Sequence, residues 1–185
     1  MRLFFALEPA KTAIGVLSGV QNDLQRLVRH EAVKWVPESR WHVTVHFLGE
    51  VSSAAGERLM DAMGLLLLAP LEFTMWSLDV FPSWDEPRAI VLRLANMRTD
   101  AFRLHQDLIP IILREDLHVS PHPWQPHITL AGVRPGRSGF FADVSHIHVP
   151  QYTFPLSRLT LFESVLGKGI QHVPIASIDL PRSYA

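Results

Sequence analysis

The sequence predicts an α+β protein in which helices cover sheets. Runs rich in β-branched and aromatic residues alternate with helical periodicity through the first two thirds of the chain, and strand-like runs dominate its end. One pattern occurs twice, as His42-Val43-Thr44-Val45 and His127-Ile128-Thr129-Leu130, with the histidines 127 − 42 = 85 residues apart. That spacing is near half of the 185 residues and indicates two similar lobes in one domain, residues 1–185.

The first half of the chain alternates strand and helix patterns. Glu8-Pro9 closes an apolar run, and Gly49-Glu50 ends a run of β-branched and aromatic residues, so each pair marks the turn after a strand. Between them, apolar residues recur at helical spacing and form one stripe. The expected elements are a strand over 2–7, a helix over 10–30, a strand over 41–48 and a helix from Ser52 or Ser53 to Leu68.

The second half is expected to contain a hairpin, one more helix and three further strands. The loop PSWDEPR, with two prolines, separates the two arms of the hairpin. Pro110 is expected to kink or end the helix, and Gly167-Lys168-Gly169 marks a tight turn between the last two strands. The expected elements are strands over 73–81 and 89–94, a helix over 97–113, and strands over 127–133, 152–166 and 170–180.

The composition limits the classes of function. Hydrophobic residues make up 48% and charged residues 19%, which is typical of a soluble globular protein, and the start of the chain lacks a signal-peptide pattern. The absence of cysteine excludes thiol nucleophiles and cysteine-based metal sites. A net charge of -1 provides no general field for a long nucleic acid. We therefore expect a cytoplasmic monomer that, if it binds RNA, binds a short piece or an end.

The repeated pattern places two kinds of polar group on one face of each strand. Because side chains alternate along a strand, His42 shares a face with Thr44, and His127 shares one with Thr129. Two such strands across a cleft would present two imidazoles and two hydroxyls. One neutral and one protonated imidazole can activate water and protonate a leaving ribose oxygen, while the hydroxyls donate to phosphoryl oxygens. This chemistry requires no metal and no cofactor.

The stretches HVTVHFLGE and PHITLAGV resemble the two signature motifs of the two-histidine phosphoesterase superfamily. The resemblance is to the RNA 2′,3′-cyclic phosphodiesterases, also called 2′-5′ RNA ligases. It extends to the start RLFFALEP, to AIVLRL, and to RLTLFESVLGKGIQHVP near the end, and so covers nearly the whole chain. It implies two lobes of antiparallel sheet with outer helices and a central cleft. It also implies opening of an RNA 2′,3′-cyclic phosphate to a 2′-phosphate, with a reversible 2′-5′ joining reaction.

The resemblance carries over to individual positions. His42 and His127 match the catalytic histidines, and Thr44 and Thr129 the phosphate-binding threonines. Phe47 matches an aromatic residue that stacks on the terminal base, although a core position would equally explain it.

One position departs from the family pattern. Gly132 stands where relatives often carry a phosphate-binding arginine. Strand alternation assigns that role to Arg134, two residues further along, with Arg40 and Lys168 as other candidates.

Two other classes of function compete with this interpretation. A metal-dependent hydrolase could use the remaining histidines, since His42 and His46 are expected on one strand face, but no acidic residue accompanies either motif. A binding module could hold an RNA end or a phosphorylated ligand without turnover, yet binding alone does not require a histidine in both motifs. The expected partners are RNA ends or small cyclic nucleotides, and the sequence does not choose between them.

Overall fold

The computed structural model describes all residues except 29–30, 97–98, 135–143, 145–146, 168 and 183–185. Within the described residues, eight strands and three α-helices are present, together with one short 3₁₀ turn, η1 (Glu38–Arg40). The helices are α1 (Lys11–Leu27), α2 (Ser53–Met63) and α3 (Asp100–Leu113). The strands are β1 (Arg2–Pro9), β2 (Val33–Trp35), β3 (Val43–Glu50), β4 (Glu72–Phe81), β5 (Ala89–Ala95), β6 (His127–Val133), β7 (Thr153–Leu166) and β8 (Ile170–Asp179).

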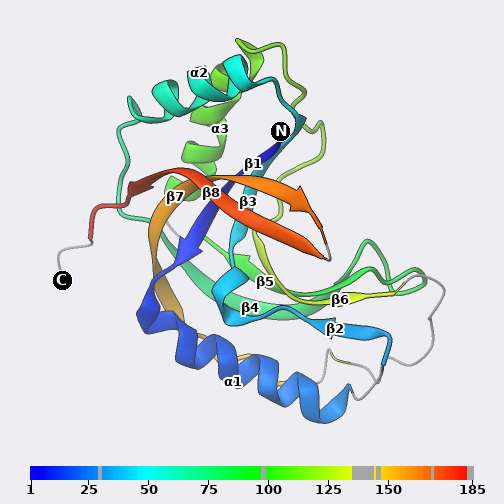
Figure 1. Cartoon of the computed structure of the whole chain (residues 1–185). Helices are drawn as coiled ribbons and strands as arrows, with labels where there is room; N and C mark the ends of the chain where they lie inside the picture. Colours follow the sequence, from blue (N-terminus) through cyan, green and yellow to red (C-terminus); the bar gives the residue numbers. More distant parts are fainter. Residues whose placement is uncertain (29–30, 97–98, 135–143, 145–146, 168, 183–185) are drawn as a thin grey trace.

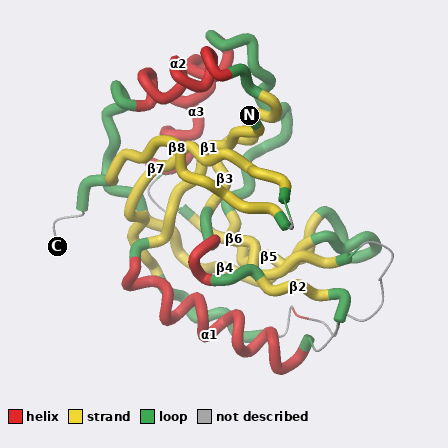
Figure 2. The backbone as a smooth tube through the Cα atoms, viewed as in Figure 1, coloured by secondary structure: helices red, strands yellow, loops and turns green. Residues whose placement is uncertain are grey.

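All strand pairings among the described residues are antiparallel, and they fall into two groups of four strands. One group has the order β3-β1-β7-β8 and the other β2-β6-β5-β4. Two short pairings join the groups, β3 with β6 and β4 with β7. Figure 2 shows the strands together in the middle of the molecule with helices on the outside. The α+β architecture with antiparallel strands is confirmed.

Each helix packs through one apolar stripe. α1 lies along one side of the molecule, whereas α2 and α3 lie together at the opposite end (Figure 1). The stripe of α1 is built from Ala13, Leu17, Val20 and Leu24, all buried. These positions recur at intervals of three and four residues, which is why one face of the helix can be apolar.

The ends of the helices differ from the sequence-based expectation in two places. Ser52 caps α2 as expected, its hydroxyl accepting from the backbone N–H of Ala55 at 3.2 Å. However, α2 ends at Met63 with Gly64 as its C-cap, so the leucines that follow it lie outside the helix. Pro110 lies inside α3 near its end instead of terminating it.

The strand β2 was not predicted. Its three residues are too few to show an alternating pattern, and it forms by pairing with β6, from Val33↔Val133 to Trp35↔Ala131. The segment carries the chain from α1 to η1, the turn that precedes the first motif. No helix in the described part of the chain is long and apolar enough to cross a membrane.

Candidate active site

The two motifs meet where the two groups of strands join. His42 directly precedes β3 and His127 begins β6, and these strands pair through Val43↔Ile128. Val43 and Ile128 are both fully buried, so the residues on either side of them face the other way. An antiparallel register through this pair sets His42 across from Thr129 and Thr44 across from His127. The four motif side chains therefore share one face.

These side chains line a cavity of about 290 Å³, named here the histidine cleft. Its lining comes from both groups of strands and from the turn before β3. The lining residues are Phe4, Val36, Arg40, His42, Thr44, Phe47, His127, Thr129, Ile170 and His172. Both motifs therefore contribute side chains to the same cleft, which is the arrangement expected from the sequence.

A β-bulge follows the threonine of each motif. In β3 the register steps from Thr44 to His46 across β1, and Val45 is the extra residue. In β6 it steps from Thr129 to Ala131 across β5, and Leu130 is the extra residue. Each bulge interrupts the alternation of side chains, so that the next residue to face the cleft comes three positions after the threonine.

Side chains from other elements satisfy the carbonyl groups at these bulges. The Trp124 indole N–H donates to the Thr44 carbonyl at 2.8 Å. The amide of Gln21, a buried residue of α1, donates to the Leu130 carbonyl at 3.0 Å. Buried carbonyls outside a regular ladder require such partners, so these two contacts stabilise both distorted strands beside the motifs.

Both motif histidines are held in the same tautomer. Nδ1 of His42 donates to the Arg40 carbonyl at 2.8 Å, and Nδ1 of His127 donates to the Gln125 carbonyl at 2.7 Å. Because a carbonyl oxygen only accepts, each Nδ1 carries a proton, and Nε2 of the neutral ring is left as a proton acceptor. Each imidazole is thus oriented by the carbonyl two residues before it.

The surroundings of the cleft favour neutral imidazoles. Burial lowers the pKa of His42 from 6.5 to about 4, and the nearby His172, His127 and Arg40 lower it further, against the Arg40 carbonyl, which raises it. Burial, followed by the charge of Arg93, also lowers the pKa of His127. Near neutral pH, His42 is therefore able to accept a proton.

Comparison with known proteins finds similarity to one family of phosphoesterases. Residues 7–91, which include the first motif, match the family model described as LigT like Phosphoesterase. The RNA 2′,3′-cyclic phosphodiesterase of Bacillus subtilis is 24% identical, and the alignment covers 90% of this chain and 93% of that protein. The protein of the same name from Aeropyrum pernix is 22% identical over 62% of this chain and 66% of its own length. Over the residues that match, the chain is therefore similar to the LigT-like phosphoesterases.

Solved structures show that the protein shares its fold with proteins of several organisms. Escherichia coli LigT, in a crystal structure with 3′-AMP, is 22% identical with a TM-score of 0.73, and the match covers 98% of each chain. TT0787 of Thermus thermophilus gives the same identity and TM-score over 100% of both chains. At this identity, the similarity establishes the fold alone.

Phe47 lies on the lip of the histidine cleft. Its side chain is 73% exposed, which decides against the alternative of a core position. The bulge at Val45 explains both neighbours, because it turns Phe47 toward the cleft and leaves His46 buried on the other side. The expectation that His42 and His46 share a strand face is therefore wrong. Stacking of a base on Phe47 stays a prediction.

The three candidate cations for the phosphate lie in different places. Arg134 is exposed, follows the end of β6 and is absent from the residues lining the cleft, so strand alternation beyond Gly132 did not bring it there. Arg40 does line the cleft, and its Nη1 donates to the Ile170 carbonyl at 2.8 Å. Lys168 lies outside the described residues. The geometry favours Arg40 over Arg134.

One functional candidate, His172, was missed in the sequence. It belongs to β8, lines the cleft, and its ring centroid lies 5.3 Å from that of His42. It has no His-x-Thr pattern around it, so no local signal distinguished it from an ordinary strand residue. Only the pairing of β8 with β7, and of β7 with β1, brings it next to the first motif.

A larger side pocket of about 670 Å³ adjoins the histidine cleft and shares Thr44, Phe47 and His127 with it. Aromatic rings and prolines dominate its wall. The remaining lining residues are Val45, His46, Phe81, Pro82, Arg88, Ala89, Val91, His105, Ser120, His122, Pro123, Trp124 and Gln125. A pocket of this size with flat apolar walls suits a ring system, and it opens beside the two motif strands.

Three stacked rings support the wall of the side pocket. The His105 ring stacks on His46 at 4.1 Å between centroids and on Trp124 at 5.0 Å. Nε2 of His46 donates to the His105 carbonyl at 2.9 Å. Burial lowers the pKa of both histidines, that of His105 from 6.5 to about 4, and the charge of His46 adds to the effect on His105. The stack is therefore built from neutral rings.

Acidification is expected to destabilise the folded protein through this stack. A histidine with a lower pKa in the folded state binds protons more readily when unfolded, so its stabilising contribution is complete above pH 6.5 and is lost as pH falls toward the folded value, about 4 for His105. Urea unfolding at pH 7.5 and 5 measures the loss. His105→Phe, which keeps a stacked ring without a titrating group, should show a smaller loss than His148→Phe at an exposed position. Equal losses in both variants would contradict the prediction.

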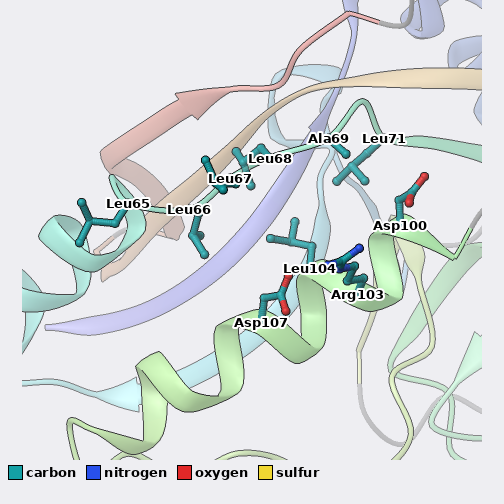
Figure 3. Close-up of a pocket in the computed structure, with 10 residues that line it drawn as sticks. All are labelled: Leu65, Leu66, Leu67, Leu68, Ala69, Leu71, Asp100, Arg103, Leu104 and Asp107. Atoms are coloured by element: carbon teal, nitrogen blue, oxygen red, sulfur yellow. The ribbon is translucent and has the colours of Figure 1, made fainter.

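A separate pocket of about 420 Å³ lies between the α2–β4 connection and α3. Figure 3 shows Leu66 on the connection pointing toward α3, near Leu104, whereas Leu65 and Leu67 point away from that helix. None of the described residues that line it is a histidine, which separates it from the chemistry of the cleft. Over the described part of the chain, no three His, Asp or Glu side chains gather as a potential metal site.

Proposed function

We propose that this protein is a LigT-like phosphoesterase, which hydrolyses 2′,3′-cyclic phosphates, on RNA ends or on nucleotides, to 2′-phosphomonoesters. The observation that carries the proposal is the matched pair of imidazoles, His42 and His127, each with Nδ1 bound to a carbonyl and Nε2 available on the same face. The names of the relatives from Bacillus subtilis and Aeropyrum pernix support this substrate class. The protein acts as a single two-lobed domain and a monomer.

The proposed reaction is one in-line displacement that uses both histidines. His42 accepts a proton from water through Nε2, and the resulting hydroxide forms a bond to phosphorus. The bond from phosphorus to O3′ breaks. His127, which takes up a proton at Nε2 when the anionic phosphate binds beside it, gives that proton to O3′. Burial lowers the pKa of His42 and so keeps its ring neutral, which is the state that a general base requires. Reversible 2′-5′ joining is the same displacement, with an RNA 5′-hydroxyl in place of water.

The remaining lining residues are suited to binding the substrate. The Thr44 and Thr129 hydroxyls donate to the non-bridging oxygens, which carry growing charge in the transition state. Arg40 supplies the positive charge that relatives place at the position of Gly132. Phe47 stacks on the terminal base, and the adjoining side pocket holds that base. The histidines and threonines come from the two motifs, whereas Arg40 comes from the turn before the first motif.

One assay tests the proposed function and its two competitors. The protein is incubated with 2′,3′-cyclic nucleotides and with RNA ending in a cyclic phosphate, in excess EDTA, and the products are separated by isomer. We expect 2′-phosphomonoesters at an undiminished rate, because the displacement uses two imidazoles and no Lewis acid. Activity that EDTA removes and added metal restores would support a metal-dependent hydrolase. Binding of the RNA end without product would support the binding module.

A further inference from the structure

The histidine cleft contains a third imidazole that the proposed displacement does not use. His172 is half-buried on β8 and faces the cleft from the side opposite β6. Its ring meets those of His42 and Phe4 edge-on, with centroids 5.3 and 5.0 Å away. These contacts hold the ring at the wall of the cleft, beside the imidazole assigned as the base.

The hydrogen bonding of His172 differs from that of the two motif histidines. Its Nδ1 lies 3.5 Å from the Ser164 hydroxyl on the neighbouring strand β7. A hydroxyl can donate as well as accept, so this ring, unlike His42 and His127, can leave Nδ1 without a proton and carry it on Nε2. In that tautomer His172 donates a hydrogen bond while it is neutral. Burial and the charge of Arg40 favour the neutral ring, because both lower its pKa.

The surroundings of His172 attract an anion. Arg40 donates to the carbonyl of Ile170, two residues before His172, and thereby ties the turn before the first motif to the start of β8. Among the described residues, Arg40 and His42 are the charged or titratable groups with a resolved electrostatic effect involving the His172 ring. The rings of Phe4 and Phe162 pack against it, and Arg2 lines a second pocket beside it. Donor groups on both sides, with apolar rings behind them, suit a phosphoryl oxygen.

We propose that His172 is a phosphate-binding residue, which donates from Nε2 to a phosphoryl oxygen and forms with Arg40 one wall of the cleft. The inference rests on the proposed function, since it assigns His172 to the same substrate. It adds a donor that neither His-x-Thr motif supplies and places it on the lobe of the first motif. Thr44, Thr129 and His172 then bind the phosphoryl group from three different strands.

Inorganic phosphate tests this assignment without requiring turnover. We expect His172→Phe, which keeps a ring against Phe4 but has no donor, to weaken phosphate binding at least about tenfold, since a hydrogen bond to a charged group is lost. His172→Gln retains an N–H donor and should recover a large part of the affinity. His148→Phe, at an exposed position away from the cleft, should bind phosphate normally. Isothermal titration calorimetry measures the affinities, and thermal unfolding confirms that each variant is folded.

Different outcomes separate this inference from the proposed function. If folded His172→Phe binds phosphate as tightly as the unmodified protein, His172 is only a packing residue and the inference is wrong. Equal weakening in His172→Phe and His172→Gln would also contradict a donor role. If the protein binds phosphate through His172 but leaves every 2′,3′-cyclic phosphate intact, the proposed function fails while the phosphate-binding role of His172 stands.

Discussion

His42→Ala and His127→Ala are each expected to reduce the hydrolysis of 2′,3′-cyclic phosphates by at least about a hundredfold. Each substitution removes a positioned acid or base, and such groups typically contribute ~10²–10⁴ to the rate. The variant with both substitutions should be only slightly less active than the less active of the two single variants, because both histidines act in one displacement. Turnover of 2′,3′-cyclic nucleotides near neutral pH measures the effect.

The fold is expected to tolerate both substitutions. His42 and His127 are partly exposed to the cleft, and the pairing that joins the strands involves the next residues, Val43 and Ile128. His148→Ala, at an exposed position, is the matched control and should retain full activity. Near-normal turnover by either cleft variant with an unchanged circular dichroism spectrum would contradict the paired-histidine mechanism.

Arg40→Met is expected to lower kcat/KM for cyclic phosphates by about 10- to 100-fold, since it removes a charged donor to the phosphate worth about 1.5–3 kcal/mol. The backbone carbonyl that orients His42 is unchanged by this substitution. Steady-state kinetics at two salt concentrations should also show a weaker dependence of KM on salt for the variant.

Arg134→Met is the matched control for the same loss of charge. Arg134 is exposed and outside the cleft, so the activity of this variant should equal that of the unmodified protein. The kcat/KM of Arg40→Lys should lie between those of Arg40→Met and Arg134→Met, because an ammonium keeps the charge but cannot reproduce the planar guanidinium. The reverse pattern, with loss in Arg134→Met and none in Arg40→Met, would return the phosphate role to the residue favoured by strand alternation.

The sequence predicted most elements because their signals are local. The strand over 127–133 coincides with β6, and the hairpin over 73–81 and 89–94 with β4 and β5. The helix expected to reach Leu68 ends at Met63, since the following leucines continue an apolar run without requiring a helix. A predicted element boundary is therefore wrong where the apolar composition continues after the backbone has left the helix.

The candidate site was predictable only in part, for a different reason. The faces of His42, Thr44, His127 and Thr129 follow from strict alternation, which holds up to each threonine. The bulges at Val45 and Leu130 then shift the alternation, and no residue pattern marks them. The bulge at Val45 therefore moved His46 to the other side of the sheet, whereas Arg134 lies outside the cleft because β6 ends at Val133, one residue before it. His172 reaches the cleft through long-range pairing, which local sequence does not encode.

Because the two strands pair at Val43 and Ile128, the backbone determines the distance between the two motif histidines. Each of these residues directly follows a motif histidine, and the hydrogen-bonded junction between them sets how far apart the two histidines stand. The connecting segments that line the side pocket, by contrast, do not determine that distance. Loops of such a protein can diverge during evolution and change the shape of the side pocket, while His42 and His127 keep their separation.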